Sequence, residues 1–110
     1  MSEYTPDKWL MLQMTNQSDG KVQYKIFGVW YGGYPSGASW QLNSGVTRVT
    51  EDDHGYHFAG RSGSVYHCNR AVYGNSGYGT SVLSHLIANS KEFDIEIMPE
   101  TTNFVELDYS

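Results

Sequence analysis

Two stretches of this 110-residue chain, 30–40 and 73–79, combine aromatic side chains with glycine, serine and asparagine. Tyrosine and tryptophan offer a large contact area with few torsions to freeze, and the small residues let the backbone adapt around them. This mixture is therefore typical of binding loops. The candidate contact residues for a partner are Trp30, Tyr31, Tyr34, Trp40, Tyr73 and Tyr78.

Other interpretations of these aromatic residues stay open. The tryptophans would also suit core positions at strand ends, with the tyrosines merely flanking turns. Tyr34 and Tyr78 stand beside glycine or proline, which favours exposure. A further alternative is a small-ligand module in which four rings form a stacking platform for a sugar or nucleobase: Trp30, Tyr31, Trp40 and Tyr73.

Acidic residues alternate with apolar ones near the end of the sequence, as Glu92, Asp94 and Glu96. In a strand these carboxylates project from one face roughly every 6–7 Å, twice the rise per residue. Phosphates along a nucleic-acid strand are spaced on a similar scale. Such a row would therefore fit a basic groove on a protein partner, as a nucleic-acid mimic does. A solvated face, or an edge strand charged against aggregation, has the same pattern.

Three histidines and the single cysteine lie close in sequence, as His54, His57, His67 and Cys68. Imidazole nitrogens bind Zn²⁺ or Cu²⁺, so a facing pair of His57 and His67 is a candidate metal site. The spacing matches no zinc motif and four ligands cannot be named, so we expect no metal and no cofactor. The simpler interpretation is surface histidines beside a buried structural thiol.

Sequence motifs for catalysis are missing from this chain. It contains no G-x-S-x-G, no H-E-x-x-H and no P-loop. Asp52 and Asp53 are adjacent, and such pairs usually shape turns, whereas hydrolase acids face each other across a cleft. Cys68 would act as a nucleophile only if its thiol were exposed near a histidine base. We expect a non-enzymatic protein, with a metal-dependent or hydrolytic His/Cys enzyme as an alternative.

Period-two alternation predicts most of the elements that must hold these residues. Asp19-Gly20 lies in a polar segment between two alternating runs, which indicates a hairpin. Glycine-rich segments predict loops at 31–37 and 73–79, and a bulge or turn at 43–45. The expected strands cover 9–14, 22–26, 40–42, 46–50, 56–60, 64–68 and 93–97. The alternation at 105–109 would allow one more.

The register of one hairpin follows from its turn. A three-residue loop over 61–63 places Gly63 at the left-handed position that such loops favour. Counting back from this loop pairs His57 with His67 on one face. The opposite face, which we expect to be the core face, then carries Tyr56, Phe58, Tyr66 and Cys68.

One helix is predicted, over 81–88. Thr80 or Ser81 would cap its start, and Asn89 would end it in a left-handed conformation. Its apolar residues recur at the spacing of one helical face: Val82, Leu83, Leu86 and Ile87. We expect residues 1–110 to form a single α+β domain. Its antiparallel β-sheet has about five to seven strands in a meander, with the short helix packed on it.

Charge and composition narrow the classes of partner that this chain is expected to bind. The formal net charge is −5, and all of it lies in residues 91–110, where six acidic residues stand against Lys91. No basic stripe exists, so direct nucleic-acid binding is not expected. No apolar run reaches the roughly 20 residues of a membrane span, so no membrane contact is expected. A single cysteine and a polar start favour a cytoplasmic location.

Together these features predict a small acidic interaction protein. It would dock on a host macromolecule, such as a nucleic-acid-handling or defence enzyme, through its aromatic loops and acidic strand. A phage or mobile-element inhibitor has this profile, an expectation that comes from size and charge alone. An aromatic surface would equally suit a homo-oligomer. The sequence names no partner.

Overall fold

The structure is a computed structural model that describes residues 2–31 and 39–109. Within these residues the chain is α+β, with mostly antiparallel strands and one α-helix, as predicted. The strands are β1 (Glu3–Tyr4), β2 (Lys8–Asn16), β3 (Val22–Trp30), β4 (Ser39–Leu42), β5 (Val46–Glu51), β6 (Gly55–Gly60), β7 (Val65–Asn69) and β8 (Phe93–Ile97). The helices are α1 (Gly77–Asn89) and the 3-10 turn η1 (Arg70–Val72).

The strands form two sheets where we expected one. Sheet A has the order β1-β7-β6-β5, and sheet B has the order β4-β3-β2-β8. The chain passes between them at Asn43, in the segment where we expected a bulge. The buried side-chain oxygen of Asn43 accepts hydrogen bonds from the N–H of Ile26 (2.9 Å) and of Gly45 (3.3 Å). The bond from Ile26 ties the crossing to β3, and the bond from Gly45 shapes the crossing itself before β5 begins.

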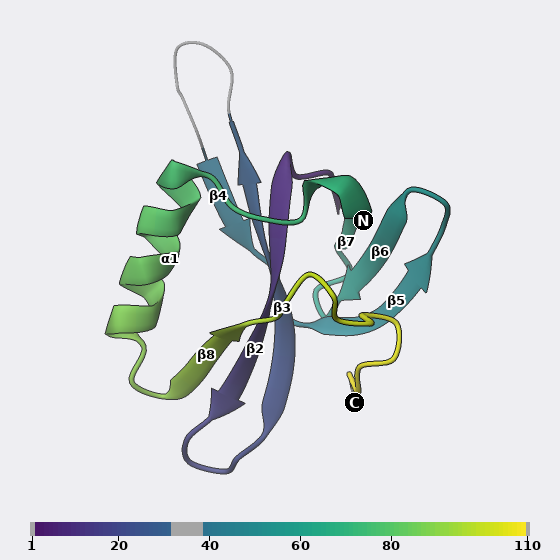
Figure 1. The fold of residues 1–110 in the computed structure, drawn as a ribbon. Helices are drawn as coiled ribbons and strands as arrows, with labels where there is room; N and C mark the ends of the chain where they lie inside the picture. The colour runs from purple at the N-terminus through teal and green to yellow at the C-terminus, as the bar shows by residue number, and fades with distance from the viewer. Residues whose placement is uncertain (1, 32–38, 110) are drawn as a thin grey trace.

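Sheet B is the middle of three layers, with α1 on one side and sheet A on the other (Figure 1). Strand β2 is buried on both faces. Trp9 and Met11 point into the core between the sheets, whereas Leu10 and Leu12 point into the core under α1. This explains why 9–14 reads as a continuous apolar run, because alternation disappears when both faces are covered.

Both predicted hairpins form. Between β2 and β3 the turn ends at Gly20, whose φ of +73° lies in the left-handed region. Between β6 and β7 the backbone at Gly63 has φ +91°, and His57 pairs with His67 as predicted. The core face of this hairpin is also as predicted: it carries Tyr56, Phe58, Tyr66 and Cys68.

Helix α1 begins at Gly77, four residues before its predicted start. The capping residue is Ser76, whose hydroxyl accepts a hydrogen bond from the N–H of Gly79 at 2.9 Å. Two glycines in the first turn hid this start, because glycine usually indicates a loop. Asn89 is still helical and donates its side-chain amide to the carbonyl of His85, so the predicted left-handed stop is wrong.

The segment after β8 forms no strand at 105–109; it turns back across the core between the sheets. Phe104 is fully buried there, and the hydroxyl of Tyr109 donates to the carbonyl of Phe104 at 2.5 Å. The Tyr109 ring packs edge-on against Tyr24 of β3. Of the predicted loop at 31–37, only Tyr31 lies within the described residues; Tyr34 lies outside them.

Candidate functional site

Four polar side chains form a row across the outer face of sheet A. The Nδ1 atoms of His57 and His67, on neighbouring strands, lie 2.6 Å apart. The Nε2 atom of His57 lies 2.6 Å from a carboxylate oxygen of Asp52, and the Nε2 atom of His67 lies 2.7 Å from one of Glu3. The order carboxylate, imidazole, imidazole, carboxylate is therefore continuous from Asp52 to Glu3.

Asp52 is placed by the turn between β5 and β6. One of its oxygens accepts the N–H groups of His54 and Gly55 at 2.8 and 2.9 Å, and the other faces His57. Bonds from the His54 backbone, the His57 ring and the Gly55 backbone hold the pKa of Asp52 well below its usual range. The carboxylate is therefore ionised at neutral pH and offers His57 a charged acceptor.

Glu3 is placed by β1, which pairs in parallel with β7 so that Glu3 lies beside Val65 and Tyr4 beside Tyr66. Sequence reasoning missed Glu3 entirely, and it took Asp52 only as a turn former. A two-residue strand that pairs with a partner some 60 residues away leaves no local pattern. The turn residue Asp52 could have been found, since it lies five positions before His57 in the predicted hairpins.

Cys68 lies on the core face of β7, opposite Tyr56, and its side chain is 2% exposed. Burial raises the pKa of the thiol well above its usual value. The two histidines lie on the other face of the same sheet. A protonated thiol, separated from both imidazoles by the sheet, has no base to activate it, so the geometry does not support a Cys–His nucleophile.

The acidic row lies on and beside β8, the edge strand of sheet B. Asp94 and Glu96 belong to the strand and Glu92 precedes it, and all three side chains are exposed. Asp94 accepts a hydrogen bond from the Gln17 amide at 3.0 Å. Among the residues that the structure describes, none of the three carboxylates forms an ion pair with a lysine or arginine.

The outer edge of β8 presents unpaired backbone groups. The N–H of Gln17 donates to the carbonyl of Glu92, and the N–H of Met98 donates to that of Met11. Because hydrogen-bonded pairs alternate in an antiparallel ladder, the even-numbered residues of this strand face β2. The N–H and C=O groups of Ile95 and Ile97 therefore point outward, where no strand of the described chain pairs with them.

Three of the predicted aromatic contact residues are exposed: Tyr31 (51%), Trp40 (39%) and Tyr78 (42%). They come from segments that meet near the start of α1. Trp40 pairs with Val29 of β3, and a Cβ at Gly79, next to Tyr78, would lie 3.1 Å from a methyl carbon of Val29. Tyr31 directly follows β3. We call these three side chains the aromatic patch.

The other two described aromatic residues serve the fold. Trp30 is half-buried against Tyr4, on the face of sheet B that looks toward sheet A, and its indole N–H donates to the carbonyl of Thr5. Tyr73 is half-buried with its ring edge-on to Trp9. We therefore leave both out of the contact surface. Of the four rings proposed as a platform for a sugar or nucleobase, Trp30 lies on the face toward sheet A and Trp40 on the face toward α1, where it stacks on Phe27.

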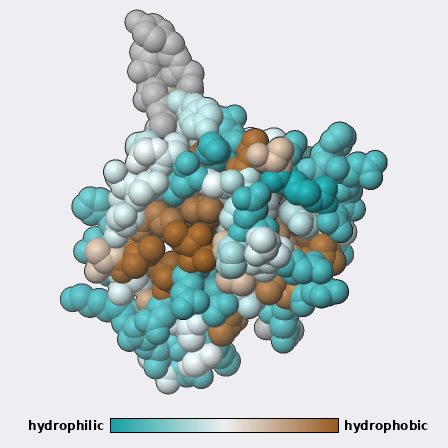
Figure 2. All heavy atoms as spheres, viewed as in Figure 1, coloured by the Kyte–Doolittle hydropathy of each residue, from teal (hydrophilic) through white to brown (hydrophobic). Residues whose placement is uncertain are grey.

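An apolar hollow of about 350 Å³ opens between α1 and sheet B. Figure 2 shows it as a hollowed brown area in the left half of the molecule. Its apolar wall comes from β2, β4, α1 and β8, and its polar rim from the end of α1. The lining residues are Leu12, Met14, Leu42, Leu86 and Ile95, with His85, Asn89 and Ser90 on the rim.

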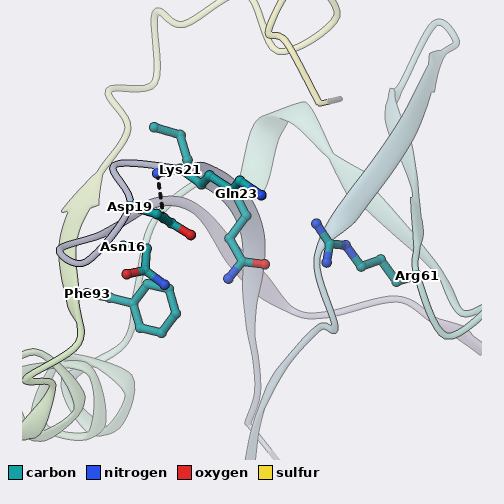
Figure 3. A pocket seen from close by; sticks show the side chains of 7 residues that line it. Asn16, Asp19, Lys21, Gln23, Arg61 and Phe93 are labelled. Atoms are coloured by element: carbon teal, nitrogen blue, oxygen red, sulfur yellow. Dashed lines mark hydrogen bonds between the residues drawn. The ribbon is translucent and has the colours of Figure 1, made fainter.

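A second, polar hollow of about 500 Å³ lies beside the β2–β3 turn (Figure 3). Its walls carry Asp19 and Lys21, whose N–H donates to the Asp19 carboxylate, and Arg61 reaches in from the β6–β7 turn. Burial and the nearby Arg61 lower the pKa of Lys25. Charges of both signs on exposed side chains define no ligand, so this hollow enters no proposal.

Comparisons with models of known protein families, with curated proteins and with solved structures each found no match. Among the described residues no helix is long and apolar enough to cross a membrane.

Proposed function

We propose that this chain is a non-enzymatic interaction protein that binds an extended, basic segment of a protein partner along the outer edge of β8. The observation that carries the proposal is the coincidence, on one strand, of outward backbone groups at Ile95 and Ile97 with exposed carboxylates at Asp94 and Glu96 that form no ion pair within the described residues. Addition of a strand to an open sheet edge is a common mode of peptide recognition.

The two faces of β8 determine which side chains would suit the partner segment. A strand added to this edge would alternate its own side chains between the two faces. On one face its side chains would meet Asp94 and Glu96, which favours lysine or arginine. On the other they would lie near Ile95 and the apolar hollow, which favours valine, leucine or isoleucine. The aromatic patch lies at the opposite edge of sheet B, beside β4, and takes no part in this strand contact.

Pairing of β8 with a second copy of itself is disfavoured by the same charges. It would bring the carboxylates of Asp94 and Glu96 close to their own copies, and like charges on facing strands are destabilising. A basic partner relieves this repulsion. An inhibitor that occupies the basic groove of a nucleic-acid-handling or defence enzyme would be one such protein.

The test uses a fluorescent peptide of alternating lysine and valine and a control peptide of equal composition with its lysines in one block. Fluorescence anisotropy should show tighter binding of the alternating peptide. The double variant D94N/E96Q should bind it roughly two- to thirtyfold more weakly, as expected for two exposed ion pairs. The variant E100Q/E106Q, which removes the same charge elsewhere, should bind like the wild type.

Backbone pairing is tested through the peptide, which leaves the protein fold untouched. N-methylation of alternate peptide residues removes the amides that would pair with β8, and only one of the two possible phases should abolish binding. Equal affinity for the blocked and alternating peptides, or full binding by D94N/E96Q, would refute the proposal.

The apolar hollow favours a second candidate function, binding of a small apolar ligand. Its wall of Leu12, Met14, Leu42, Leu86 and Ile95 would hold a short hydrocarbon chain. Titration with decanoate, followed by the methyl NMR signals of these side chains, should then give saturable shifts that Leu86→Gln removes. Shifts that do not saturate would exclude this function.

A further inference from the structure

The histidine pair on sheet A turns its two Nδ1 atoms toward each other and its two Nε2 atoms toward carboxylates. Each Nε2 atom faces a carboxylate oxygen, which only accepts, so each Nε2 atom carries its hydrogen. In the neutral form of both rings, the two Nδ1 atoms would then face each other with lone pairs at 2.6 Å. Two lone pairs at this distance repel, so the gap suits a proton or a metal cation.

We propose that His57 and His67 bind a divalent transition metal ion, Zn²⁺ or Cu²⁺, through their Nδ1 atoms, with Asp52 and Glu3 as outer carboxylates. Histidines that ligate metals usually donate their other ring N–H to a carboxylate, which fixes the tautomer and strengthens the ligand. Both histidines here have such a partner. Imidazole is a preferred ligand for both metals.

The rings need only a small movement to admit the ion. Metal–nitrogen bonds of about 2.0–2.1 Å at a tetrahedral angle place two ligand nitrogens about 3.3 Å apart. From 2.6 Å, the two Nδ1 atoms would separate by about 0.7 Å. Both imidazoles are about one-third exposed, so their outer sides are open for this shift.

The remaining coordination positions belong to water or to a partner. Within the described part of the chain, no three histidine, cysteine, aspartate or glutamate side chains are placed around one point. A hollow of about 160 Å³ adjoins the pair and is lined by both histidines, His54 and Asp52. It has room for several waters. An open site with two protein ligands should bind more weakly than a closed structural site with four.

The experiment titrates the whole protein with Zn²⁺ by calorimetry and with Cu²⁺ by electron paramagnetic resonance, in a buffer that does not bind metals. We expect one ion per chain and a Cu²⁺ signal split by two nitrogens. His57→Gln and His67→Gln should each lose at least tenfold in affinity. His85→Gln, which removes an exposed histidine of α1, is the matched control and should bind normally.

The outer carboxylates give a second readout that a general folding role would not produce. Asp52→Asn and Glu3→Gln should keep the same number of bound ions and weaken binding roughly 10- to 100-fold. Circular dichroism confirms that each variant is folded. The proposal fails if the wild type takes up no more metal than the H57Q/H67Q double variant.

Discussion

Replacing Tyr73 by phenylalanine removes one oxygen atom that takes part in two hydrogen bonds. The hydroxyl accepts from the N–H of Met11 at 3.2 Å and donates to the carbonyl of Met98. It thus joins β2 to the segment that leaves β8, in a half-buried position. A typical net contribution is about 0.5–1.5 kcal/mol per hydrogen bond, so the variant should lose about 1–3 kcal/mol of unfolding free energy.

Urea denaturation followed by tryptophan fluorescence measures this loss, and Trp9, whose ring centre lies 4.6 Å from that of Tyr73, reports on the site directly. A thermal scan should show a fall in Tm of roughly 4–8 °C per kcal/mol. Tyr78→Phe is the control, because that side chain is exposed in the aromatic patch and should change stability by less than about 0.5 kcal/mol. Equal stability of the two variants would show that the Tyr73 hydroxyl does not hold the fold.

Three further predictions concern single buried positions. Burial, with smaller effects of Tyr4 and Cys68, raises the pKa of Tyr66 from 10.0 to about 12. The unfolded chain therefore loses this proton first, and stability should fall by up to about 3 kcal/mol as the pH rises from 10 to 12. Urea titrations at each pH should show that Tyr66→Phe removes this part of the decline; an unchanged slope would refute the assignment. Gly55→Ala should lose about 3 kcal/mol in the same assay, because its Cβ would lie 2.1 Å from the carbonyl oxygen of Cys68. Gly77→Ala, with no atom within 4 Å, should be neutral or gain up to about 1 kcal/mol. The Cys68 thiol should react with a thiol reagent only after unfolding, and rapid labelling of the native protein would contradict its burial.

The β6–β7 hairpin shows which parts of the fold the sequence could predict. Its turn chemistry and its period-two alternation are local, and together they determine the facing of His57 and His67. The exposure of the Asp94 and Glu96 side chains could also be predicted from neighbouring residues, since their alternation with apolar residues is enough to indicate it. The partner-binding role of that strand stays a prediction.

Features that depend on distant contacts could not be predicted in this way. The division into two sheets depends on hydrogen bonds between Asn43 and Ile26 of β3, which a pattern of neighbouring residues does not contain. Tyr73 has glycine beside it, as a loop residue would, yet its ring lies in the core because Trp9 and Phe104 surround it. Glu3 reaches His67 only because β1 pairs with β7.

Strand β2 contributes side chains to both apolar cores, so unfolding of either core that displaces β2 would also disrupt the other. The layers should consequently melt together as one cooperative unit. Amide hydrogen exchange would show this as similar protection in β2, β3 and β6, governed by global rather than local opening. A partner held at the β8 edge would then slow exchange even in strands on the far side of the molecule.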